Sequence, residues 1–194
     1  MHKRVAIAAA AALAACGGGS NWTDPTTGSF TAQDSAEIMG LFAGSFGAVA
    51  QSGMNAQMAA QNPKALTQSV SFSSSCAPSG SVSVTGSMDA SCNSTGTSCS
   101  FNGGLHLALN SCANPNGLVG DGQLNLGASG SSTSTSFSVH ETIQGGITVT
   151  RNGTLVGTCG INVTADVSAT GLDTASPVET VHVTGTICRQ PVAQ

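Results

Sequence analysis

The strongest constraint on the fold is a two-residue alternation of apolar and polar side chains that begins near residue 68 and continues almost to the end of the chain. Leu105, Leu107 and Leu109, for example, are separated by a histidine and an alanine. Successive side chains of a β-strand point to opposite faces of a sheet, so the pattern predicts strands with one apolar and one solvated face. We expect a mainly β fold: an antiparallel meander of about six or seven strands over residues 68–194, forming a curved sheet or a partly closed barrel.

A helical period precedes the alternating region. Thr31 followed by Asp34 forms a capping-box-like start, and the carboxylate suits the positive end of a helix. Apolar residues then fall on one helical face: Ile38, Leu41, Phe42, Phe46 and Val49. Asn62-Pro63 ends the helical pattern. We expect residues 30–67 to be a helical segment packed on the apolar face of the sheet, within one domain of residues 30–194.

The cysteine positions test the predicted pairing of strands. Pairing Val84 with Leu107 keeps the apolar residues of two strands on the same face, whereas a slip by one residue would not. The cysteines play no part in choosing this register, yet it places Cys92 directly opposite Cys99. We therefore predict a disulfide between these two residues.

The remaining cysteines suggest two further disulfides. Cys112 falls near Cys76 when the same register is continued, which predicts a second pair. Cys159 and Cys188 are left by elimination, although Cys188 has the opposite parity from Ile187. An even number of cysteines in an exported chain is typical of a disulfide framework, and no C-x-x-C pair suggests a zinc or redox site.

The longest predicted hairpin turns at Asn152-Gly153. A two-residue turn would leave Leu155 on the polar side, so we predict a three-residue loop that pairs Val149 with Leu155. Each arm would then run for about 43 Å at about 3.3 Å per residue, which exceeds the usual length of a strand. We expect a bulge or bend at Gly145-Gly146 for that reason.

The N-terminal residues have the order of a leader for export. Lys3 and Arg4 precede an apolar stretch, Val5–Ala15, that would rise only about 16 Å as a helix, too short for a bilayer core of about 30 Å. Leu13-Ala14-Ala15-Cys16 resembles the lipobox of bacterial lipoproteins. The resemblance implies that residues 1–15 are removed as a signal peptide and that Cys16 is the lipid attachment site.

The same resemblance implies where the mature chain resides. Several acyl chains of the palmitate type on Cys16 would anchor the protein in the cell envelope. Residues 16–29, which begin with a run of glycines and a serine, are expected to be a lipidated N-terminus and flexible tether. Gly17 stands where an aspartate would resemble an inner-membrane retention mark, which favours the outer membrane.

Charge excludes several classes of partner. Loss of the leader leaves three cations, Lys64, Arg151 and Arg189, against nine carboxylates. Nucleic-acid binding and attraction to an anionic membrane surface both need clustered basic residues, so neither is expected. The membrane is therefore expected as a partner only through acyl chains on Cys16.

Catalytic and metal-binding patterns are scarce. No hydrolase, zincin, phosphate-loop or dinucleotide motif occurs, so we expect neither an enzyme nor a cofactor. His106, His140 and His182 fall on the polar face of strands that are too far apart to bind one ion together. Aligning the last strands places His182 opposite Asp166 and His140 diagonal to it. This cluster would be a weak divalent-ion site or a solvated charge pair.

These patterns favour a membrane-anchored lipoprotein with a non-catalytic structural or interaction role. The Ser- and Thr-rich polar face could bind a glycan or a partner strand, or serve solubility alone, and the sequence identifies no partner. The alternative is a carrier of lipid or another apolar ligand, because one helix is a small cover for so large an apolar face. Similarity in outline to periplasmic lipid-handling half-barrels is the basis of that alternative.

Overall fold

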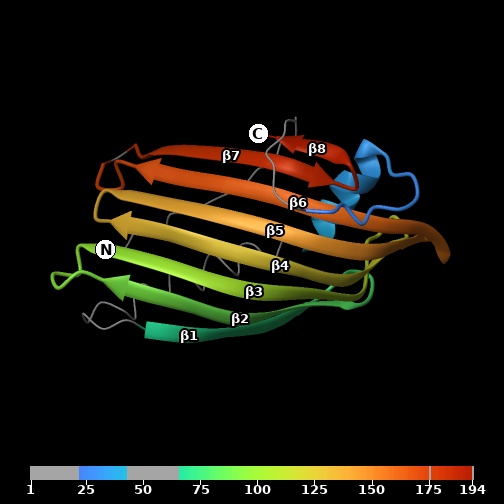
Figure 1. The fold of residues 1–194 in the computed structure, drawn as a ribbon, viewed down its shortest axis with the longest axis horizontal. Helices are drawn as coiled ribbons and strands as arrows, with labels where there is room; N and C mark the ends of the chain where they lie inside the picture. Colours follow the sequence, from blue (N-terminus) through green and yellow to red (C-terminus); the bar gives the residue numbers. More distant parts are fainter. Residues whose placement is uncertain (1–21, 43–65, 175, 194) are drawn as a thin grey trace.

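The computed structural model describes residues 22–42, 66–174 and 176–193. Their strands form a single antiparallel sheet in which each strand pairs with the next along the chain (Figure 1). The strands are β1 (Leu66–Ser75), β2 (Ser81–Cys92), β3 (Ser98–Ala113), β4 (Leu118–Thr133), β5 (Ser136–Arg151), β6 (Thr154–Thr170), β7 (Val178–Ile187) and β8 (Gln190–Ala193). The meander thus has eight strands rather than six or seven. The strand that the sequence did not reveal is β8, whose four residues are too few to show an alternation.

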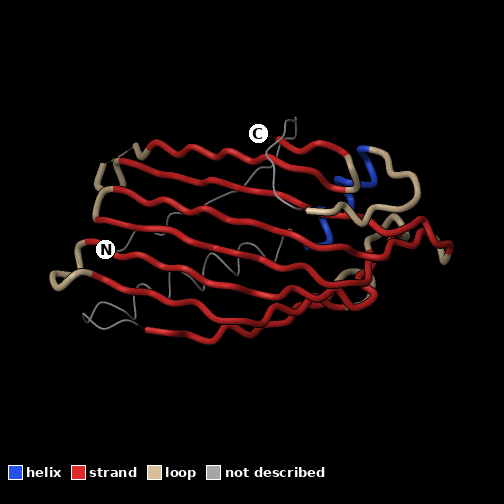
Figure 2. The backbone as a smooth tube through the Cα atoms, viewed as in Figure 1, coloured by secondary structure: helices blue, strands red, loops and turns tan. Residues whose placement is uncertain are grey.

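The sheet is open, with β1 at one edge and β8 at the other, so the partly closed barrel is not formed. Figure 2 shows the long strands running side by side across the molecule. The strands β3, β4 and β5 each contain 16 residues and β6 contains 17, which is longer than usual. No bulge occurs at Gly145-Gly146, since β5 pairs continuously with both neighbours through these glycines.

The predicted register of β2 and β3 is confirmed. Val84 faces Leu107 and Cys92 faces Cys99. A register shift follows Leu109 in the pairing of β3 with β4, where Ser111 adopts a left-handed conformation with φ of 46°. The apolar parity therefore does set strand pairing over the central part of these strands, as the burial of one face requires.

The predicted three-residue loop of the β5–β6 hairpin is wrong. Arg151 pairs with Thr154 across a two-residue turn in which Asn152 and Gly153 both have positive φ, 50° and 81°. Such a turn matches the twist of the flanking strands. A bulge directly beyond it pairs Val149 with Gly157 and restores the apolar parity, while Leu155 stays 65% exposed. The bulge leaves one residue of β6 unpaired, so the two-residue turn and the burial of the apolar face are both preserved.

The apolar residues of the strands form one buried core. The side chains that are almost completely buried there include Val84, Met88, Leu105, Leu107, Leu109, Leu124, Ile147, Ile161 and Ile187. They belong to a single cluster that also includes Ile38 and Phe42 of the helical segment. The alternation seen in the sequence therefore corresponds to one packed face and one polar face of the sheet.

The described helical residues, 32–42, pack on the apolar face near the β5–β6 turn. Their start is the predicted capping box, in which the Asp34 amide donates to Thr31 Oγ1 at 3.1 Å and the Thr31 amide donates to Asp34 Oδ2 at 2.7 Å. Leu41 lies directly over Gly120, where a Cβ would come within 2.8 Å of its side chain. Phe46, Val49 and the stop at Asn62-Pro63 lie outside the described residues. Within the described ranges, no helix has the length and apolar character needed to cross a membrane.

The segment of residues 22–30, which we call the strap, belongs to the folded domain. The Thr27 amide donates to the Thr158 carbonyl at 2.9 Å, and the Gly160 amide donates to Thr26 Oγ1 at 2.9 Å. The strap thereby covers the edge of β6 that extends beyond the end of β7, and such coverage protects a sheet edge. Residues 22–29 are consequently not the free tether that the sequence suggested. Residues 1–16, including the predicted signal peptide and Cys16, lie outside the described residues.

Candidate functional site

The polar face of the sheet carries side chains in regular rows that run across the strands. One row, which we call the central row, follows the strand pairing from β1 to β7 without a break. It consists of Thr67, Asp89, Asn102, Ser129, His140, Asp166 and His182. The register of the meander, and not proximity in sequence, assembles this row, because each strand contributes one residue at the same level.

Three of the four titratable residues of the central row, His140, Asp166 and His182, are those that the sequence singled out, and Asp89 is the fourth. His182 lies opposite Asp166, as predicted, but His140 also lies directly opposite Asp166 rather than diagonal to it. The bulge after Val149 shifts the register of β5 on β6 and is the reason for the difference. His140 Nδ1 lies 2.7 Å from Asp166 Oδ1, with the two side chains 51% and 55% exposed. A pair this exposed contributes little to stability.

The three histidines of the polar face do not converge. His106 belongs to β3, which β4 separates from the strand of His140, and its Nδ1 lies 2.8 Å from Asn125 Oδ1. Among the residues that the structure describes, no group of three His, Cys, Asp or Glu side chains is placed to hold a metal ion. Within this cluster, His140 and Asp166 are hydrogen-bonded to each other.

Two adjoining hollows lie over the central row. The larger has a volume of about 700 Å³ and extends across β3 to β7, while the smaller has about 350 Å³ and extends across β2 to β5. Asn102, Ser129 and His140 line both hollows, so the two together form one trough across the polar face. From β2 to β7 the trough spans five strand spacings, or about 24 Å at about 4.8 Å per strand.

A second group of charged residues joins the helix to the sheet away from this trough. Arg151 Nη2 donates to Asp34 Oδ1 at 2.7 Å and to Glu37 Oε2 at 2.9 Å. Burial alone would raise the pKa of Asp34, but hydrogen bonds from Thr31 and the Arg151 guanidinium outweigh it and hold that pKa below its usual range. Hydrogen bonding from Gln33, opposed by burial and helped by Arg151, lowers the pKa of Glu37 as well. This group is a structural joint between elements.

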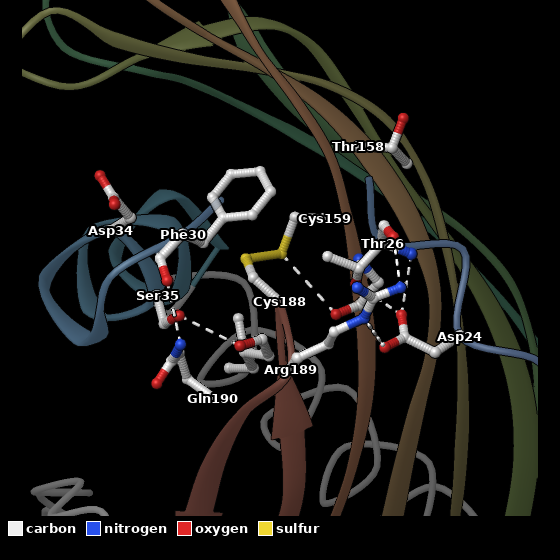
Figure 3. Close-up of a disulfide and its surroundings, with 12 residues drawn as sticks. Asp24, Thr26, Phe30, Asp34, Ser35, Thr158, Cys159, Cys188, Arg189 and Gln190 are labelled. Carbon is white, nitrogen blue, oxygen red and sulfur yellow. Dashed lines mark hydrogen bonds and ion pairs between the residues drawn. A yellow bond between two sulfur atoms is a disulfide. The ribbon is translucent and has the colours of Figure 1, made fainter. Parts of the chain in front are cut away.

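The other described arginine secures the strap. Arg189 Nη2 donates to the Thr26 carbonyl at 2.7 Å, and its Nε donates to Asp24 Oδ2 at 3.2 Å. Burial tends to raise the pKa of Asp24, yet the hydrogen bonds from Thr26 and Arg189 lower it overall. Figure 3 shows these residues on one side of the Cys159–Cys188 disulfide and Phe30 with Ser35 on the other. The strap and the turn between β7 and β8 are thus held together.

All three predicted disulfides are present: Cys76–Cys112, Cys92–Cys99 and Cys159–Cys188. The parity conflict at Cys188 is resolved by the backbone. Cys188 follows the end of β7 and adopts a left-handed conformation with φ of 51°, so it does not continue the alternation of that strand. Both Cys159 and Cys188 are buried in the core.

One carboxylate departs from the division into two faces. Glu141 has the apolar parity of β5 and faces Ala128 and Ala165 on the neighbouring strands. Burial raises the pKa of its carboxyl above the usual range. The strand pairing at this position is regular, so the exception lies in the side chain alone.

Sequence reasoning identified His140, Asp166 and His182 but missed the trough that contains them. The trough depends on which residues from six strands share one level, and that depends on the bulge after Val149. The contacts of Asp24 and Thr26 were also missed, because the strap is aperiodic and its partners are more than a hundred residues away. No local signal in the sequence indicates either feature.

Comparison with protein-family models, with curated proteins and with solved structures found no match to this chain.

Proposed function

We propose that this protein is an exported, lipid-anchored lipoprotein of the cell envelope that has a non-catalytic interaction role through the polar face of its sheet. The observation that carries the proposal is the trough over the central row, which offers hydroxyl, amide, imidazole and carboxylate groups to a partner. Three disulfides support export, because such bonds form and persist in oxidising compartments. Anchoring at the outer membrane rests on the lipobox-like Leu13-Ala14-Ala15-Cys16 and on Gly17.

The packing of the core favours an interaction role over a carrier of apolar ligands. Leu107, Ile147 and Ile161 are all 0% exposed. They pack within one continuous cluster of the protein's own side chains. A carrier needs apolar surface that a ligand can cover, whereas these central residues are already covered. Native mass spectrometry that found a bound lipid would favour the carrier instead.

Metabolic labelling tests the anchor. Cells that express the wild-type chain and a Cys16→Ser variant are grown with an alkyne analogue of palmitate, and the labelled protein is followed through membrane fractionation. We expect label and membrane association in the wild type and neither in the variant. A wild-type chain without label, or a variant labelled equally, would contradict the proposed anchor at Cys16.

A further inference from the structure

Two glycines form part of the floor of the smaller hollow on the polar face. Gly104 of β3 and Gly127 of β4 face each other across the strands and both line the hollow. A Cβ built on Gly104 would meet no atom within 4 Å, and one on Gly127 would meet only Thr142 Oγ1 at 2.7 Å, at the end of a rotatable side chain. Neither the backbone nor the packing therefore requires glycine at Gly104, and a small side-chain rotation would accommodate a Cβ at Gly127.

Several other glycines in the strands differ in this respect. A Cβ at Gly103 would come within 2.6 Å of the Ser87 carbonyl oxygen, and one at Gly130 would come within 2.6 Å of the Phe101 ring. A Cβ at Gly146 would come within 3.1 Å of Pro25 in the strap. Glycine in a strand weakens the strand, and where no bulge or bend explains it, it often marks close approach of a ligand. Gly104 and Gly127 fit that case.

The chemistry of the trough restricts the class of ligand. Both described arginines, Arg151 and Arg189, form ion pairs with carboxylates outside the trough. Neither of them is therefore placed to bind an anionic ligand in the trough. Asp89 and Asp166 in or beside the hollows would repel an anion. The remaining polar side chains are hydroxyls, amides and imidazoles, which donate and accept hydrogen bonds. Phe101, Val139 and Val167 also line the larger hollow. An uncharged, polyhydroxylated ligand matches this set.

Shape and composition favour a chain-like ligand over a protein surface. The cores of protein interfaces are enriched in aromatic residues, Met and Arg. The strand residues Phe72, Phe101, Phe137 and Met88 all have the apolar parity. Of these four only Phe101 lines the trough, and it is only 8% exposed. A trough about 24 Å long, open along its length, can hold several units of a linear chain.

We propose that the trough binds a linear, uncharged glycan, which lies across the central row and approaches the backbone of β3 and β4 at Gly104 and Gly127. This inference rests on the proposed interaction role of the polar face and names its ligand class. Binding depends mainly on many hydrogen bonds that each contribute little, because Phe101, the phenylalanine that lines the trough, is only 8% exposed. Affinity is therefore expected to rise steeply with the length of the glycan.

Isothermal titration of the purified full chain in detergent micelles tests the proposal. The probes are cellohexaose and chitohexaose, which are uncharged, their disaccharides, and hexagalacturonate as an anionic control. Gly104→Leu fills the smaller hollow, whereas Thr85→Leu adds the same side chain on the same face outside both hollows. Equal urea midpoints for the two variants and the wild type establish that each one folds.

We expect a neutral hexasaccharide to bind at least about tenfold more tightly than its disaccharide, a difference of about 1.4 kcal/mol. Gly104→Leu should weaken that binding at least about tenfold, and Thr85→Leu should change it less than about twofold. The proposal is overturned if neither hexasaccharide, nor the neutral polysaccharide fraction of the host envelope, binds. Equal binding of hexagalacturonate, or binding that Gly104→Leu does not affect, also overturns it.

The outcomes separate this inference from the proposed function. Suppose that no glycan binds, but a purified protein partner does and Gly104→Leu abolishes its binding. This result would overturn the proposal of a glycan ligand and would leave the proposed interaction role in place. If the chain binds a glycan but carries no palmitate label at Cys16, the proposal of a glycan ligand is supported and the proposed lipid anchor is contradicted.

Discussion

Replacing Arg151 with methionine tests how the helix is joined to the sheet. The guanidinium lies at the end of β5 and donates to Asp34 and Glu37 of the helical segment, at 2.7 and 2.9 Å. The side chains of Arg151, Asp34 and Glu37 are 31%, 17% and 11% exposed. Methionine keeps much of the length and the apolar stem but removes both hydrogen bonds, leaving two mostly buried carboxylates without their cation.

The expected cost follows from these contacts. A hydrogen bond to a charged group contributes about 1.5–3 kcal/mol, and leaving a buried partner unpaired costs about 1–3 kcal/mol. The Arg151 side chain is nearly one-third exposed, so water screens the interaction and reduces its value toward that of a surface pair. We expect Arg151→Met to lower the free energy of unfolding by about 2 kcal/mol at pH 7.

The same substitution should change the pH dependence of stability. The pKa values of Asp34 and Glu37 lie below their ordinary values of 3.8 and 4.5 in the folded protein. Groups whose pKa is depressed by folding stabilise the folded state above the unfolded pKa, and this contribution is lost as pH falls through the folded pKa. The wild type should therefore lose stability below about pH 4.5, and the variant should lose less, because part of the depression comes from Arg151.

Urea unfolding followed by circular dichroism at pH 7 and at pH 3 measures both effects. Arg189→Met is the comparison, since Arg189 is 61% exposed and its loss should cost less than about 1 kcal/mol. The difference in the free energy of unfolding between the wild type and Arg151→Met should be smaller at pH 3 than at pH 7. The reasoning would be refuted if Arg151→Met lost no more stability than Arg189→Met. It would also be refuted if the stability difference between the wild type and Arg151→Met were the same at both pH values.

Two further predictions concern the disulfides and the buried carboxylate. Replacing one cysteine of each pair with serine should destabilise the protein more the longer the loop that the disulfide encloses. The sequence separations are 7 for Cys92–Cys99, 29 for Cys159–Cys188 and 36 for Cys76–Cys112. The chain-entropy relation gives roughly 2.5, 3.6 and 3.8 kcal/mol, with Cys92–Cys99 the smallest, and urea midpoints that reverse this order would contradict it. Glu141→Gln should raise the urea midpoint at pH 7 and not at pH 3.5, because burial raises the folded pKa of Glu141 and ionisation then costs stability as pH rises through it. A variant equally stabilised at both pH values would show that the charge is not the cause.

The parts of the fold that the sequence predicted correctly are those governed by local periods. Apolar parity placed Val84 opposite Leu107 and thereby Cys92 opposite Cys99, because a slip by one residue would bury the polar face. The capping box at Thr31 and Asp34 was predicted for a similar reason, since its partners lie three residues apart. Each of these inferences needs only neighbours in sequence or one buried face.

Errors arose where two local rules conflicted. At Asn152-Gly153 the turn type required two residues and the apolar parity required three. The protein satisfies both by a bulge, and no single-sequence rule says where a bulge will be placed. The paired position of His140 and Asp166 follows from that bulge, which is why the sequence placed them diagonally. The strap was missed because its contacts with β6 leave no periodic signal in residues 22–30.

The sequence alone determined that the domain is an antiparallel meander with one apolar face and six paired cysteines, because alternation and burial are encoded residue by residue. Only the tertiary structure decided that the sheet stays open, that the strap covers the edge of β6, and that Gly104 and Gly127 meet beneath a trough. These features depend on the pairing registers of several successive strands taken together. A shift at a single bulge moves every residue beyond it to a new neighbour.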